Sequence, residues 1–128
     1  MRSLERLAWH LVQTLTEMPA KAGLLNEDVL EHESMPASMS AITTLYKQYS
    51  EKVADVVKEK WTDESLQQTE NMYGQLWERG KILSVLVKHQ THHRAQMTII
   101  MRVLGMPVPG VYGPSKEEWV AYGMTPME

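Results

Sequence analysis

The chain has 128 residues, a formal net charge of −3 at pH 7 and 43% hydrophobic residues, which suits a single globular domain over residues 1–128. Its slight acidity argues against nucleic acid as a partner, because binding phosphates needs a cationic face. No apolar run approaches the ~20 residues that span a membrane, and the charged residues 1–6 are unlike a secretory signal. Cysteine is absent, which excludes thiolate ligands and disulfides and fits a cytoplasmic protein.

The first element predicted is an amphipathic helix. Apolar residues recur at three- and four-residue steps over residues 4–18, and Pro19 and Gly23 mark the end of this helix. Residues 24–36 have few apolar anchors, so they are predicted to form a connector with at most one helical turn.

A second helix is predicted to begin after Pro36, with Ser38 or Ser40 as its N-cap. It ends near Trp61, because the polar residues that follow are typical of a turn or a new start. Residues 62–75 are weakly patterned and are predicted to be extended or turning. They give no signal for a β-hairpin.

The third and longest helix is predicted from about Trp77 to Leu104. Gly105 and then Pro107 form a strong stop signal. After a loop rich in proline and glycine, a short helix is expected between Ser115 and Gly123, with Glu118 in the capping-box position. These elements predict an all-α fold of three long helices and a short C-terminal helix.

The histidines are the main candidates for chemistry. His89 and His93 are four residues apart, so they lie on one helical face, and both interrupt the apolar stripe that should face the core. Burying two unpaired imidazoles would cost ~2–7 kcal/mol each, whereas a divalent metal would satisfy both. His10, at the edge of the first helix's apolar face, is the candidate third ligand.

The residues alone leave other interpretations open. The histidine pair also suits hydrogen bonds to core carbonyls or a wet groove, because short motifs match often by chance. His32 lies in the polar connector and is expected to be exposed, and His92 is expected to lie beside the site. Tyr46 and Tyr49 of the second helix are better explained as core residues than as parts of a pocket.

Residues 89–96 (HQTHHRAQ), with 102–105 and 108–115, resemble the DinB-like (damage-inducible) metalloprotein family, which is unrelated to the lesion-bypass polymerase of that name. Members carry an H-x-x-x-H-R-G-Q pattern near the end of a long helix, and an earlier histidine in a segment similar to residues 2–10. The resemblance covers essentially the whole chain. Ala95 replaces the glycine of the pattern, a change that suits a helix.

The resemblance implies metal ligands at His10, His89 and His93. It also implies an up-and-down helix bundle that is often dimeric. Family members usually have one more helix before the segment that begins here at Arg2, so a bundle without that first helix is expected. The apolar stripes of residues 4–11 or 42–56 would then be open, which predicts a homodimer. The alternative is that the short C-terminal helix covers the gap.

The resemblance suggests several functions, since relatives include thiol-dependent isomerases, small-thiol S-transferases and metal-dependent hydrolases. Three histidines suit zinc, nickel, iron or cobalt and leave a position open for a small thiol substrate or water. A thiol S-transferase is favoured, because few acidic residues lie on the inward faces to act as a general base. A non-catalytic, dimeric metal-binding protein is the alternative.

Overall fold

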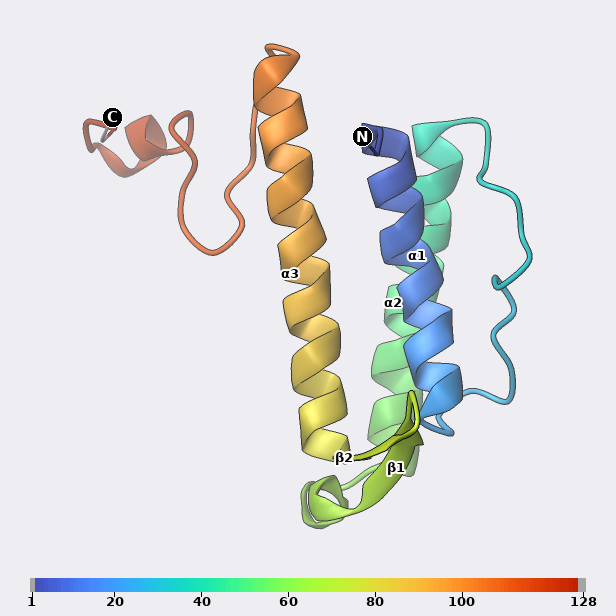
Figure 1. Ribbon diagram of the computed structural model, residues 1–128. Helices are drawn as coiled ribbons and strands as arrows, with labels where there is room; N and C mark the ends of the chain where they lie inside the picture. Colours follow the sequence, from blue (N-terminus) through green and yellow to red (C-terminus); the bar gives the residue numbers. More distant parts are fainter. Residues whose placement is uncertain (1, 127–128) are drawn as a thin grey trace.

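The computed structural model describes residues 2–126 (Figure 1). The predicted domain 1–128 therefore includes three residues, Met1 and 127–128, that lie outside the described part. Three long α-helices dominate the described residues, with a small two-stranded sheet and two 3-10 helices. The elements in chain order are α1 (Leu4–Lys21), α2 (Met39–Lys60), η1 (Asp63–Gln67), β1 (Thr69–Met72), β2 (Gln75–Glu78), α3 (Arg79–Val103) and η2 (Trp119–Tyr122).

Serine side chains begin the first two helices. Ser3 accepts a hydrogen bond from the backbone N–H of Arg6, and Ser38 accepts one from that of Ala41, so each satisfies a free donor in the first turn. Of the two N-caps considered from the sequence, Ser38 is therefore the one used. Pro19 does not end α1 but lies within its last turn.

Helix α1 occupies the central place, because it packs against both α2 and α3. Side chains from all three helices form the larger core cluster, and a second cluster lies between α1, α2 and the connector. The connector is better anchored than its sequence suggests, since Leu24 and Leu30 are almost fully buried. Burial of this kind stabilises the fold by about 25 cal/mol per Å² of apolar surface removed from water.

The apolar stripes that were expected to be open are mostly closed. Leu7 and Leu11 of α1 are buried, as are Ile42 and Val53 of α2, because the helices cover one another. The short C-terminal segment does not provide this cover, since Figure 1 shows it on the side of α3 away from α1 and α2.

The described residues are mostly helical, as predicted, but the prediction that there is no β-hairpin was wrong. Strands β1 and β2 pair antiparallel, with Met72 opposite Gln75. Tyr73 and Gly74 form the turn, and both have positive φ angles, 55° and 80°. Two-residue turns of this kind usually contain Asn-Gly or Asp-Gly, and these strands do not alternate apolar and polar residues. The residues of this hairpin therefore carry little sequence signal for it.

The boundaries of the last two helices also differ from the prediction. Trp77 and Glu78 belong to β2, so α3 begins at Arg79. The C-terminal helix is a 3-10 turn that begins at Trp119, three residues later than an N-cap at Ser115 predicts, and Gly123 ends it in the left-handed conformation. Glu118 does accept the hydrogen bond from the Ser115 N–H that the capping box requires. Among residues 2–126, no helix is both long and apolar enough to cross a membrane.

Candidate metal centre

The packing of α1 against α3 brings three histidines together. His10 comes from α1, while His89 and His93 come from successive turns of α3. The Nε2 atom of His89 lies 3.3 Å from that of His10 and 3.2 Å from that of His93. Their candidate ligand atoms all lie within 4.8 Å of one another, so the cluster can hold a metal ion.

The spacing of these nitrogen atoms fits a divalent ion. Zinc binds imidazole nitrogen at ~2.0–2.1 Å in tetrahedral geometry, which places two nitrogens about 3.3 Å apart. The two distances that join His89 to the other histidines match this value. Without an ion, one neutral imidazole can donate its Nε2–H to a neighbouring Nε2. A shared cation would instead accept the lone pairs of all three nitrogens.

Burial keeps two of these imidazoles neutral. It lowers the pKa of His10 to about 4, and the charges of His93 and His89 act in the same direction. Burial also lowers the pKa of His89, with His93 as the next cause. Neutral imidazole is the form that binds metals, because its unprotonated nitrogen has a free lone pair.

A hydrogen bond fixes the tautomer of His93, the most buried of the three. Its Nδ1 lies 2.7 Å from Oε1 of Gln96. A carbonyl oxygen can only accept, so Nδ1 carries the proton and Nε2 is left free to bind an ion. Nδ1 of His89 is buried without a hydrogen-bond partner. His92 contacts Gln96 from the exposed side, and His32 is exposed, so both lie outside the cluster.

A buried amide that sequence reasoning missed ties the helices together beside the histidines. Gln90 Nε2 donates to the Leu11 carbonyl and to Thr14 Oγ1, both at 3.0 Å, and Gln90 Oε1 accepts from the Tyr46 hydroxyl at 3.2 Å. Gln90 thus contacts α1 and α2 from α3. Tyr46, which was assigned to the core, also accepts a hydrogen bond from Arg94. The sequence signal that could have placed Gln90 in the core was its spacing, because it follows the buried Leu86 by four residues, or about one helical turn.

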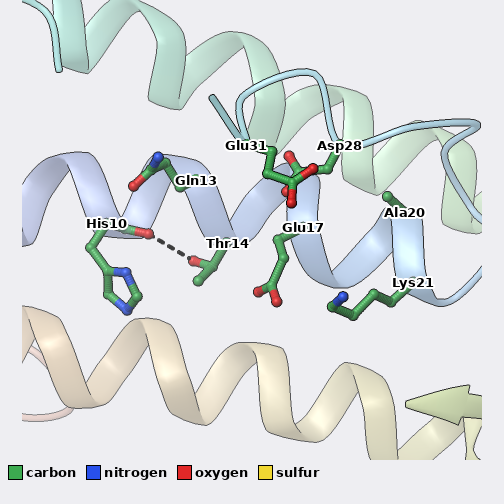
Figure 2. A pocket seen from close by; sticks show the side chains of 8 residues that line it. All are labelled: His10, Gln13, Thr14, Glu17, Ala20, Lys21, Asp28 and Glu31. Atoms are coloured by element: carbon green, nitrogen blue, oxygen red, sulfur yellow. Dashed lines mark hydrogen bonds between the residues drawn. The ribbon is translucent and has the colours of Figure 1, made fainter. Parts of the chain in front are cut away.

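A cavity of about 550 Å³ opens beside His10, and we call it the α1 cavity (Figure 2). Its lining includes Glu17 and Lys21 of α1 and two acidic residues of the connector, Asp28 and Glu31. Sequence reasoning expected few acidic residues on the inward faces and did not place these three near the site. None of their carboxylates joins the histidine cluster among the described residues.

A second cavity, of about 330 Å³, borders His93, and we call it the α3 cavity. It is lined by Arg2, Leu7, His93, Gln96, Ile99 and Ile100. It shares no lining residue with the α1 cavity, and it is more apolar. The histidine cluster therefore borders two separate cavities of different character.

Comparisons with known proteins define the class of this chain. The DinB family model matches residues 1–126, so the chain belongs to the DinB family. It is 39% identical over 122 residues to the uncharacterized protein YrdA of Bacillus subtilis (strain 168), covering 95% of this chain and 73% of that protein. The crystal structure of a DinB-like protein from Bacillus cereus ATCC 10987 is similar, with a TM-score of 0.75 and 32% identity. That match covers 86% of this chain and 73% of the other.

Proposed function

We propose that this chain is a metal-dependent enzyme that transfers a small thiol to an electrophilic substrate, with His10, His89 and His93 as the metal ligands. The convergence of the three Nε2 atoms carries the proposal. A divalent ion with three protein ligands keeps an open position, where it would favour the thiolate form of a bound thiol. Zinc, nickel and iron all accept imidazole, and the donor set favours none of them.

The two cavities support a transfer between two substrates. His10 borders the polar α1 cavity, which suits a small polar thiol. His93 borders the α3 cavity, where Ile99 and the guanidinium of Arg2 suit an apolar electrophile with an acidic group. A transfer is favoured over hydrolysis, because no carboxylate among residues 2–126 belongs to the histidine cluster as a general base.

Activity on thiol and electrophile pairs tests this function. Wild-type protein loaded with zinc, nickel or iron is expected to accelerate the reaction of small thiols with 1-chloro-2,4-dinitrobenzene or monobromobimane. His93→Ala protein should show only the background rate, because a ligand is lost, whereas His92→Ala protein should stay within a few-fold of wild type. Fully loaded wild-type protein without activity on any pair would instead identify the chain as a non-catalytic metal-binding protein.

We also propose that two copies of the chain associate as a homodimer and complete an up-and-down helix bundle. Helix α3 supports this proposal, because Ile99 and Val103, one turn apart, are 66% and 82% exposed. Leu104 and Met106 extend the same apolar end of the helix. Large exposed apolar patches are uncommon on monomers and often mark interfaces.

Light scattering at micromolar concentration is expected to give a mass of two chains for the wild-type protein. Glu substitutions at Ile99 and Val103 should give a mass of one chain, since two charges would be desolvated at the interface. Both side chains are exposed, so the double variant should keep its far-UV spectrum. A wild-type mass of one chain in a well-folded protein would rule out the dimer.

A further inference from the structure

We propose that the α1 cavity recognises an α-amino acid head group on its thiol substrate, with Glu17 contacting the ammonium group and Lys21 the carboxylate. This inference rests on the proposed function, because it assumes that the substrate is a thiol whose sulfur reaches the histidines. The head group itself is recognised by side chains of α1 that lie away from the histidines.

The position of these residues along α1 supports the proposal. His10, Thr14, Glu17 and Lys21 follow one another at steps of four, three and four residues, so they share a helical face. Figure 2 shows His10, Glu17 and Lys21 directed to the side of α1 on which α3 lies. At 1.5 Å per residue, Glu17 and Lys21 are about 10 and 16 Å along the axis from His10. Along α1, the cavity therefore extends from His10 to Lys21.

Glu17 and Lys21 carry opposite charges that do not pair with each other. Glutamate four residues before lysine is the favourable order for an ion pair on a helix. Nevertheless, neither residue is part of an ion pair within 4.0 Å in the described part of the chain. A zwitterionic head group can contact both, since one helical turn separates them by about 6 Å.

Tyr73 of the hairpin turn explains why the two charges stay apart. Its hydroxyl donates to Glu17 Oε2 at 3.2 Å, and Lys21 Nζ lies 5.4 Å from the centre of its ring. Tyr73 has a φ of 55°, a left-handed conformation that is uncommon for a bulky residue. The turn thus holds both side chains in place, and the Glu17 carboxylate keeps further acceptor positions for a ligand.

The other acidic residues have different roles. Asp28 Oδ1 accepts from Thr16 Oγ1 at 2.6 Å and from the Leu30 N–H at 3.2 Å, so it closes the connector rather than facing a ligand. Glu31 has a largely exposed side chain whose nearest charged partner is the exposed His32. Glu31 also lines the cavity, and its negative charge further favours an ammonium group over an anion.

Calorimetry with S-methylglutathione tests the proposal on metal-free protein, because this probe has an α-amino acid head group and no free thiol. We expect its N-acetylated form, which lacks the ammonium group, to bind wild-type protein about tenfold more weakly, as for the loss of one charged hydrogen bond. Glu17→Gln should abolish this preference, while the Gln oxygen can still accept from Tyr73. Lys21→Met should weaken the intact probe by a similar factor, and the exposed control Glu59→Gln should change neither affinity.

Equal affinities of the two probes for wild-type protein, or a preference that persists in Glu17→Gln, would overturn the proposal. Lys21→Met provides an independent test if Glu17→Gln does not fold. A separate titration of the cobalt-loaded protein with glutathione and 2-mercaptoethanol tests thiol binding at the histidines. It therefore distinguishes failure of the proposed function from failure of head-group recognition. No spectral change with either thiol would contradict thiol binding at the histidines, and with it the assignment of the head group to a thiol substrate.

Discussion

Replacing His93 by alanine is expected to weaken the binding of a divalent ion on the order of a thousandfold. The binding free energy of zinc in small zinc domains is ~10–16 kcal/mol, and we expect roughly a third of it to be lost when one of three ligands is removed. His93 is also the histidine whose tautomer is fixed by Gln96, so its Nε2 is the best prepared of the three. Competition titration with a chromogenic chelator measures the affinity.

Two histidine variants serve as matched controls for His93→Ala. His32 is exposed in the connector, and His92 is exposed next to the cluster without belonging to it. His32→Ala should bind metal like wild-type protein. His92→Ala should lose at most about tenfold, because His92 contacts Gln96 and the edge of the His93 ring without being one of the three candidate ligands. Equal affinities of wild-type and His93→Ala protein would refute the ligand assignment.

Gln90→Leu is expected to lower the free energy of unfolding by about 2–4 kcal/mol. The substitution removes three hydrogen bonds and leaves the Leu11 carbonyl, the Thr14 hydroxyl and the Tyr46 hydroxyl without their Gln90 partner. Because Gln90 joins α3 to α1 beside His89 and His93, two of the proposed ligands, metal affinity should also fall, by about 10- to 100-fold. Urea unfolding of the metal-free protein and a metal titration measure the two effects.

Gln13→Leu is the matched control for this substitution. Gln13 makes one side-chain hydrogen bond, to the Leu30 carbonyl at 3.3 Å, and it belongs to α1. Its loss should cost about 1 kcal/mol or less and leave the metal affinity unchanged. If Gln90→Leu protein is as stable as Gln13→Leu protein, the buried amide does not hold the helices together.

Local periodicity was sufficient to find two of the three histidines of the cluster. The spacing of His89 and His93 on a long helix placed both on the face that packs against α1, and the structure brings them together. His10 is 79 residues away from His89, and no local pattern links the two positions. The place of His10 at the edge of an apolar helix face made it a candidate, and the family resemblance linked it to His89 and His93. The packing of α1 against α3 accounts for this link physically.

The missed features depend on contacts between distant segments. Gln90 and Thr14 are polar residues on helical faces, and their burial is explained by hydrogen bonds to each other and to neighbouring groups, which become visible only in the structure. The hairpin turn places Tyr73 in a left-handed conformation that its residue type does not favour. In this conformation the Tyr73 side chain contacts α1, which no local sequence pattern predicts. The acidic residues of the α1 cavity come partly from the connector, which the sequence pattern did not place against α1.

X-ray absorption spectroscopy of the metal-loaded wild-type protein tests the central claim most directly, namely a three-histidine centre with a position open to thiols. We predict three imidazole nitrogens at about 2.0–2.1 Å, and a sulfur neighbour at about 2.3 Å once a small thiol is added. A spectrum with four protein ligands that does not change on addition of thiol would contradict the account, as would a spectrum without imidazole.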